Sequence, residues 1–391
     1  MSHKILVVDD EPDLELLIKQ KFRKQIRDNE LQFVFAQNGV QALEKIRQHD
    51  DITVVLSDIN MPEMDGLTLL QKLHELNNPV LKSVIVSAYG DIDNIRTAMN
   101  RGAFDFLTKP IDFNDLDITV KKTMQHLEVL KDALRSHDEL VAVQRDLSTA
   151  TRIQQSLLPR TFPPFPDRPE VDIYAEMLTA KEVGGDFYDF YYIDEDRLAF
   201  VIGDVSGKGI PAAIYMAVCR TLLKAIAHQI VHPGEVLRKT NTLLIPDSED
   251  ATFVTVFYGV INIHSGEMQY SNGGHCSPYI VRASGQVEQL PLTDGFILGK
   301  IDHLDYDAKK AHLEQGDTLF LYTDGVIEAM DSDSNLYEED RLWTYLQATN
   351  GSSIQDIVKG SIADLKRFAG DAQQSDDITV LTLRYAGVNG S

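Results

Sequence analysis

The chain has 391 residues, of which 43% are hydrophobic and 25% are charged, an ordinary globular composition. This length predicts two domains with a possible connector. Its formal net charge of −23 disfavours binding to nucleic acid or to an anionic membrane, both of which would repel it, although the charge also serves solubility.

Cysteine content and hydropathy limit the cellular setting. The only cysteines are Cys219 and Cys276, which rules out a disulfide framework and a CxxC zinc site. The first apolar segment starts almost at once, at residues 4–8, with no signal peptide ahead of it. No apolar run approaches the roughly 20 residues of a membrane-spanning helix. We therefore expect a cytoplasmic protein without a membrane partner.

Strand and helix patterns alternate over residues 1–125. Short apolar strands are expected at 4–10, 31–36, 52–58, 83–88 and 104–110, with amphipathic helices near 13–28, 39–48, 65–77, 91–101 and 113–125. Five such units predict an α/β fold, a doubly wound five-stranded parallel sheet. Its ligand crevice would lie at the carboxyl ends of the strands.

Chemically active residues stand at these strand ends. Asp9 and Asp10 follow the first strand and Asp58 ends the third, while Ser87 and Lys109 end the fourth and fifth. Three converging carboxylates repel one another unless a hard cation lies among them, and oxygen ligands suit Mg²⁺. A single Asp here could be a turn or helix cap; the joint pattern favours a site.

The motifs VVDD, SDINMPEMDG, VSA and FLTKP in this region together resemble those of a two-component response-regulator receiver domain. The resemblance implies that Asp58 accepts a phosphoryl group from a sensor histidine kinase. It also implies a role for each strand-end residue: Asp9, Asp10, Asp58 and the carbonyl of Asn60 would hold Mg²⁺, Lys109 and Ser87 would contact the phosphate, and Phe106 would be the aromatic switch. A cis peptide between Lys109 and Pro110 is a further family feature.

Residues 113–158 contain neither glycine nor proline, and their apolar residues recur at a spacing of three and four. This pattern predicts a long helix able to form an imperfect two-stranded coiled coil. A solvated helix packed on its own domains is the alternative. The segment TFPPFPDRP (161–169) would end the helix. We expect a receiver at 1–125, a helical signalling linker at 126–158 and a second domain at 159–387.

The second domain is rich in strands. They are expected at 171–178, 187–193, 197–204, 252–263, 266–274, 278–283, 306–313, 317–325 and 377–385, with helices near 211–229, 233–245, 338–348 and 353–369. Many strands joined by hairpins, with helix pairs inserted, predict an α/β/β/α two-sheet sandwich.

Four aspartates of this domain lie in glycine- or acid-flanked strand ends. They are Asp186 in EVGGDFYD, Asp204 in GDVSGKG, Asp324 in YTDG and Asp376 in DDIT. GDVSGKG is not a P-loop, because Ile202 stands where the first glycine is needed and Gly209 where Ser or Thr must follow the lysine. Aspartates without nearby His or Cys indicate Mg²⁺ or Mn²⁺. Two such ions about 3.5–4 Å apart can activate water for phosphoester hydrolysis.

From about Ile153, in IQQSLLP, to Arg384 the chain resembles the PPM/PP2C-type metal-dependent Ser/Thr phosphatases, in the bacterial branch of sporulation and stress-sigma-factor phosphatases. The resemblance implies that Asp186, Asp204, Asp324 and Asp376 are catalytic metal ligands, that Asp204 bridges the ions, and that the Val205 carbonyl adds a ligand. Ser206 replaces the histidine proposed as general acid in the eukaryotic branch. Lys181 is a candidate for the phosphate-clamping arginine. His275 could contribute to catalysis, although a structural role fits it better.

These resemblances predict a response regulator whose phosphorylation at Asp58 controls, and is expected to activate, a phosphoprotein Ser/Thr phosphatase. The implied substrate is a phosphorylated anti-sigma-factor antagonist, and the linker predicts a homodimer. Two alternatives stay open: a phosphatase-fold adaptor that binds a partner without chemistry, and hydrolysis of a small phosphorylated metabolite. Retention of all four aspartates disfavours the adaptor.

Overall fold

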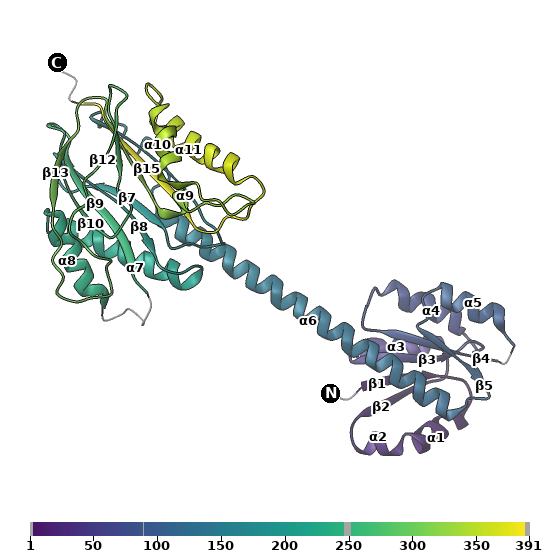
Figure 1. Ribbon diagram of the computed structural model, residues 1–391. Coiled ribbons are helices and arrows are strands. Elements are labelled where there is room, and N and C mark those ends of the chain that lie inside the picture. The colour runs from purple at the N-terminus through teal and green to yellow at the C-terminus, as the bar shows by residue number, and fades with distance from the viewer. Residues whose placement is uncertain (1–2, 89, 246–251, 388–391) are drawn as a thin grey trace. The chain divides into compact units, whose positions relative to one another are not determined.

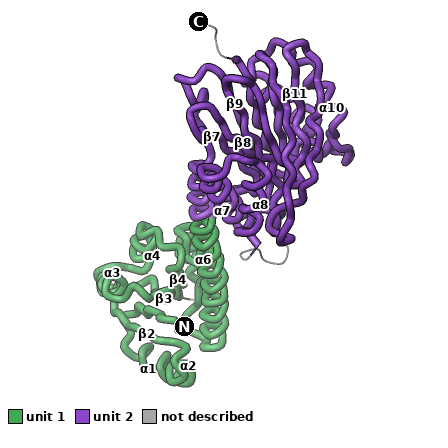
Figure 2. Tube along the Cα trace, turned by 90° about the vertical axis from the view of Figure 1, so that its left-hand side faces the viewer, with its two compact units in different colours: residues 1–143 green, residues 144–391 purple. Residues whose placement is uncertain are grey.

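A computed structural model describes residues 3–88, 90–245 and 252–387. The chain divides into two compact units, residues 1–143 and 144–391, drawn in different colours in Figure 2. Each unit is described by itself below.

Unit 1 is built on a parallel five-stranded sheet (Figure 1). Its strands, in the order β2-β1-β3-β4-β5, are β1 (His3–Val8), β2 (Leu31–Ala36), β3 (Ile52–Asp58), β4 (Lys82–Ala88) and β5 (Asp105–Lys109). Its helices are α1 (Pro12–Lys21), α2 (Arg23–Arg27), α3 (Gly39–Gln48), α4 (Gly66–Glu75), α5 (Ile92–Asn100) and the first part of α6 (Phe113–Leu157). This is the predicted doubly wound sheet.

Both faces of this sheet are buried: successive side chains of β1 point to opposite faces, and both sets are buried. Ile5 and Val7 belong to a core that includes Ile18 of α1 and Leu116 of α6, whereas the alternate residues of β1 pack with α3 and α4 on the other side. The helix expected at 13–28 is divided at Phe22, whose buried ring lies 5.3 Å from that of Phe33.

Helix α6 is continuous from Phe113 to Leu157, so the helix expected at 113–125 and the helical linker expected to follow it are one element. The division between the two units falls within it, at Val143 and Gln144. The predicted linker boundaries at 125 and 158 and the predicted coiled coil stay predictions.

Unit 2 contains two five-stranded sheets with antiparallel pairing. The first, in the order β13-β10-β9-β8-β7, comprises β13 (Lys309–His312), β10 (Glu267–Gly273), β9 (Val254–Asn262), β8 (Arg197–Val205) and β7 (Phe187–Tyr192). The second, in the order β12-β11-β14-β15-β6, comprises β12 (Val287–Gln289), β11 (Tyr279–Val281), β14 (Thr318–Tyr322), β15 (Ile378–Tyr385) and β6 (Val171–Leu178).

Helices cover the outer faces of the two sheets (Figure 1). They are α7 (Ile210–Ala227) and α8 (Pro233–Leu244) on the first sheet, and α10 (Glu338–Gln347) and α11 (Ile354–Ala369) on the second; the short α9 (Asp324–Ile327) follows β14. Leu319 and Leu321 point into the core between the sheets, whereas Phe320 and Tyr322 pack with α10 and α11. This is the predicted α/β/β/α sandwich.

Among the residues described, α7 is long and apolar enough to cross a membrane by length and composition alone, a feature the sequence analysis did not expect. Met216, Cys219 and Leu223 of this helix are fully buried in the core of unit 2, while Arg220 and Lys224 interrupt its apolar pattern. One face of α7 is therefore buried in the core, whereas Ile210, Ile214 and Val218 of the same helix are exposed.

Candidate functional site

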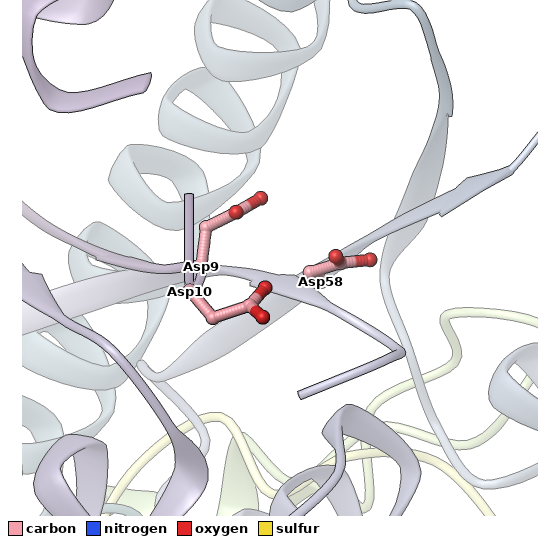
Figure 3. Close-up of side chains that lie close together, drawn as sticks. All are labelled: Asp9, Asp10 and Asp58. Carbon is pink, nitrogen blue, oxygen red and sulfur yellow. The ribbon is translucent and has the colours of Figure 1, made fainter. Parts of the chain in front are cut away.

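In unit 1, three carboxylates converge at the carboxyl edge of the sheet. Asp9 and Asp10 follow β1 and Asp58 ends β3, and one ligand oxygen from each lies within 4.8 Å of the others (Figure 3). Burial raises the pKa of Asp9, opposed by the Glu11 backbone N–H and by Lys109. A compact set of oxygen ligands with excess negative charge fits a hard divalent cation such as Mg²⁺.

Lys109, at the end of β5, supplies positive charge to this cluster. Its Nζ lies 2.8 Å from Asp58, 3.0 Å from Asp9 and 3.1 Å from Glu11. Burial lowers the pKa of Lys109, but its hydrogen bonds, led by that to Asp58, raise it overall. The ammonium therefore stays charged beside Asp58, where it could also neutralise a phosphoryl group.

The other expected receiver residues lie on β4, on β5 and in the bend after β3. Ser87 is fully buried at the end of β4, and its hydroxyl donates to Asp91 over 3.3 Å. Phe106 on β5 pairs with Ile85 of β4, and its side chain is 39% exposed. Asn60 lies in the exposed bend after β3, and the peptide bond between Lys109 and Pro110 is cis.

In unit 2, the predicted metal aspartates lie where the two sheets end beside each other. Asp186 precedes β7, Asp204 lies in β8, Asp324 starts α9 directly after β14 and Asp376 precedes β15. Asp186 is 1% exposed and accepts hydrogen bonds from Thr323 (2.8 Å) and Thr379 (2.6 Å). Thr379 lies on β15 of the second sheet and Thr323 directly follows β14 of that sheet, so Asp186 links the two sheets at the site.

Burial and mutual repulsion raise the pKa values of three of these carboxyl groups. Burial, followed by the neighbouring Asp204 charge, raises the pKa of Asp186. Burial and the Asp324 carboxylate raise the pKa of Asp204 to about 7, although its hydrogen bond with Asp186 opposes this. Burial also raises the pKa of Asp324, with Glu328 and Asp376 adding negative charge. Buried acids of this density fit divalent cations, which would offset their repulsion.

The four predicted metal aspartates of unit 2 do not form a single tight cluster. The unit 1 group is the one set of three or more acidic, His or Cys residues within 4.8 Å that the described residues contain. Within the described part of unit 2, no three carboxylates have ligand oxygens that all lie within 4.8 Å of one another. Val205 ends β8, and a Cβ on Gly185 would approach its carbonyl oxygen to 2.5 Å. Glycine is needed there for this close approach.

Two residues that contact the predicted site were missed from the sequence. Lys208, considered only in rejecting a P-loop, lies 3.0 Å from Asp376 and also donates to the Ser375 carbonyl. Asp377 was seen only as a second acid, yet it is 4% exposed and accepts from the backbone N–H groups of Ala180 (2.8 Å) and Gly185 (2.7 Å). The adjacent acids gave a signal for a site, but the sequence could not separate their roles.

The two remaining candidate residues, Lys181 and His275, differ in exposure. Lys181 is exposed in the loop that leads to Asp186. His275 is 6% exposed, with Nδ1 2.8 Å from the Thr255 hydroxyl, and burial lowers its pKa to about 4. A neutral, buried imidazole is a poor proton donor at neutral pH, which favours the structural role of His275.

The fold and these sites define a receiver domain joined to a PP2C-like phosphatase domain. Residues 5–121 match the family model for the response regulator receiver domain, and residues 194–386 match that for stage II sporulation protein E (SpoIIE). The chain therefore belongs to the response regulators that carry a SpoIIE-type, metal-dependent phosphatase domain.

Individual relatives agree with this assignment. Phosphoserine phosphatase RsbU of Bacillus subtilis is 29% identical over 256 residues, which cover 64% of this chain and 75% of RsbU. Chemotaxis protein CheY of Bacillus subtilis is 34% identical over 125 residues, covering 32% of this chain and 99% of CheY. Protein IcfG of Synechocystis and transcriptional regulatory protein ZraR of Klebsiella oxytoca are matched over less than half of their own length.

A solved structure supports the fold of unit 2. The SiaA-PP2C domain of Pseudomonas aeruginosa superposes with a TM-score of 0.57 at 20% identity, covering 63% of this chain and 98% of that domain.

Proposed function

We propose that this protein is a response regulator in which phosphorylation of Asp58 by a sensor histidine kinase controls a phosphoprotein Ser/Thr phosphatase. The observation that carries the catalytic part is the convergence of the buried Asp186 with the half-buried Asp204 and Asp324, whose pKa values are all raised, at one end of the sandwich. Perturbed acids gathered in this way are typical of a functional site.

The four aspartates would hold two Mg²⁺ or Mn²⁺ ions, with the Val205 carbonyl as a further ligand. Such ions, when bound, supply positive charge to a phosphoryl group and lower the pKa of water. Thr323 and Thr379 orient Asp186 by hydrogen bonds to the same carboxylate oxygen. Lys208 fixes Asp376 by its ion pair. These contacts prepare the carboxylates before a substrate arrives.

We propose that the exposed Lys181, five residues before Asp186 in the same loop, binds the substrate phosphate. We propose a phosphoserine or phosphothreonine protein as substrate, since RsbU is named a phosphoserine phosphatase. An anti-sigma-factor antagonist is the substrate that the sequence resemblance suggests. We place the protein in the cytoplasm, without nucleic-acid or membrane partners.

We also propose a homodimer through α6. Several apolar side chains between residues 129 and 143 of this helix are exposed, namely Val129, Leu134, Leu140, Val141 and Val143. Exposed apolar residues along one helix, two of which (Leu134 and Val141) lie seven residues apart, support pairing with the same helix of a second chain.

Asp204→Asn tests the catalytic proposal. Removing this charge, which interacts with both Asp186 and Asp324, should reduce phosphate release from a phosphoserine protein about 100-fold or more, because metal retention depends on it. Loss of a repulsive buried charge should leave the thermal unfolding midpoint unchanged or raised. The assay measures Mn²⁺-dependent phosphate release from a phosphoserine protein and from a small phosphate ester.

Normal activity of Asp204→Asn at physiological metal concentrations would contradict the two-metal site. An unmodified protein that folds and binds a partner but releases no phosphate would support the adaptor alternative, and a preference for the small ester would support a metabolite phosphatase.

A further inference from the structure

The last turns of α6 are hydrogen-bonded to the loop that carries Asp186, entirely within unit 2. Gln154 is 6% exposed, and its amide makes two hydrogen bonds with one residue of this loop. Its Nε2 donates to the Gly184 carbonyl over 2.6 Å, and the Gly184 N–H donates to Oε1 over 3.2 Å. We call this pair of bonds the Gln154 clamp.

A second contact from the same face of α6 supports the clamp. The Thr151 hydroxyl lies 2.7 Å from the carbonyl oxygen of Glu182 and 3.0 Å from that of Leu147, one turn back in the helix. Its proton can therefore be given to the loop or to the helix. Residues 182–184 are thus hydrogen-bonded to two polar side chains, Thr151 and Gln154, which lie three residues apart on α6.

Gly184 is held from its other side by the acid that sequence reasoning missed. A Cβ at position 184 would lie 2.0 Å from Oδ2 of Asp377, an approach that only glycine permits. The same oxygen accepts from the Gly185 N–H over 2.7 Å and lies 3.5 Å from the Asp186 nitrogen. Gln154 and Asp377 therefore enclose the backbone two residues before the buried carboxylate of Asp186.

We propose that Gln154 is a positioning residue for the metal site: through Gly184 it sets the placement of Asp186, so that any displacement of the last turns of α6 is transmitted to metal binding. This inference rests on the proposed phosphatase function. In this proposal, the Gln154 side chain is the contact through which α6 acts on the metal site. A buried amide that satisfies both backbone groups of one loop residue cannot be replaced by an apolar side chain without leaving both unpaired.

The test compares Gln154→Ala with the matched control Gln155→Ala, which removes the same amide from the exposed neighbouring position. Gln154→Glu is a second variant of nearly the same size; it retains an acceptor for the Gly184 N–H but has no donor for the Gly184 carbonyl. All variants are made in the full chain.

Three measurements are needed. Calorimetric titration with Mn²⁺ gives the affinity of the phosphatase site after subtraction of the binding retained by Asp204→Asn. Hydrogen exchange reports the protection of the Gly184 and Gly185 amides. Steady-state kinetics with a phosphoserine protein give kcat and KM at low and at saturating Mn²⁺.

Loss of a residue that orients metal ligands typically weakens metal binding by roughly 10–100-fold. We expect Gln154→Ala to weaken Mn²⁺ binding by about that factor, to expose the Gly184 amide to exchange, and to lower kcat at low Mn²⁺ with KM unchanged. Saturating Mn²⁺ should restore much of the rate. The Mn²⁺ affinity of Gln154→Glu should lie between those of Gln154→Ala and the unmodified chain. Gln155→Ala should behave as the unmodified chain does.

Unchanged Mn²⁺ affinity in both Gln154 variants, with a lowered melting temperature alone, would overturn the proposal and leave Gln154 a structural residue. Failure of the proposed function is a separate result. A chain that releases no phosphate from phosphoserine proteins, but whose Mn²⁺ affinity depends on Gln154, would refute the phosphatase assignment and not the clamp.

Discussion

Two adjacent acids, Asp376 and Asp377, show how environment divides roles between identical side chains. Asp376 is partly exposed and forms an ion pair with Lys208, so its carboxylate remains available at the edge of the site. Asp377 is buried and saturated by backbone N–H groups of the 180–186 segment. We therefore expect Asp376 to act on metal and Asp377 to act on the backbone that carries Asp186.

A buried ion pair behind the site offers a test of stability at the level of single residues. Asp189 of β7 is 1% exposed, and its Oδ2 lies 2.6 Å from Arg220 and 3.6 Å from Lys224, both on α7. Burial raises the pKa of Asp189, while Arg220 opposes the rise. Arg220→Ala removes the nearer cation and should lower the free energy of unfolding by about 3–5 kcal/mol at pH 7.

The pH dependence of this loss follows from the direction of the shift. An acid whose folded-state pKa lies above its unfolded value binds more protons when folded, so folding gains stability as pH falls toward the unfolded value near 4. The deficit of Arg220→Ala relative to the unmodified chain should therefore shrink between pH 7 and pH 5. Urea unfolding at both pH values measures it, with Asp189→Asn/Arg220→Ala as the control that removes the titrating group. A constant deficit would contradict the role assigned to Asp189.

Sequence reasoning reached those candidate site residues that stand in a distinctive local pattern. Asp186, Asp204 and Asp324 stand beside glycines at predicted strand ends, and the fold brings them together. Asp189 and Arg220 carry no such pattern, because only the packing of α7 on β7 makes them partners. Contacts of this kind depend on tertiary structure.

At the level of elements, α6 shows what an apolar pattern predicts and what it leaves undetermined. The spacing of three and four predicted one long helix, and the structure has it. The same spacing could not tell which positions are covered: Leu116, Val120 and Leu127 are buried in unit 1, whereas Leu140 and Val143 are exposed. Periodicity identifies an apolar face, and only the neighbouring elements decide what it packs against.

An insertion in α6 tests whether this helix carries the signal. Four residues added after Leu134 would rotate the following turns by about 40° beyond a full turn and advance them by about 6 Å. Basal phosphatase activity should persist because both units are intact, but the response to phosphorylation of Asp58 should be lost. Phosphate release with and without a phosphodonor measures it, and sedimentation reports the oligomeric state.

Seven inserted residues are the matched control, since they bring the helix back to within about 20° of its original phase. This variant should keep much of the response. Equal responses in the two insertions, or a strictly monomeric protein in both phosphorylation states, would contradict signalling through a paired helix.

At the scale of the whole molecule, one chain joins a receiver unit and a phosphatase unit through a single helix. Phosphorylation would place a dianionic group beside Lys109 and Ser87, and Phe106, still partly exposed, would be free to repack. A change of packing in unit 1 would bias α6, and the Gln154 clamp would pass the bias to Asp186. Such coupling requires that α6 has two arrangements, and that the states of the receiver site and of the phosphatase site each change the balance between them.

The most direct test of this account measures the phosphatase rate on a phosphoserine protein before and after addition of acetyl phosphate or a histidine kinase, in the unmodified chain and in Asp58→Asn. The account predicts a rate that rises on phosphorylation in the unmodified chain and does not change in Asp58→Asn, with equal basal rates in both. A rate that still responds to the phosphodonor in Asp58→Asn would contradict control through this aspartate.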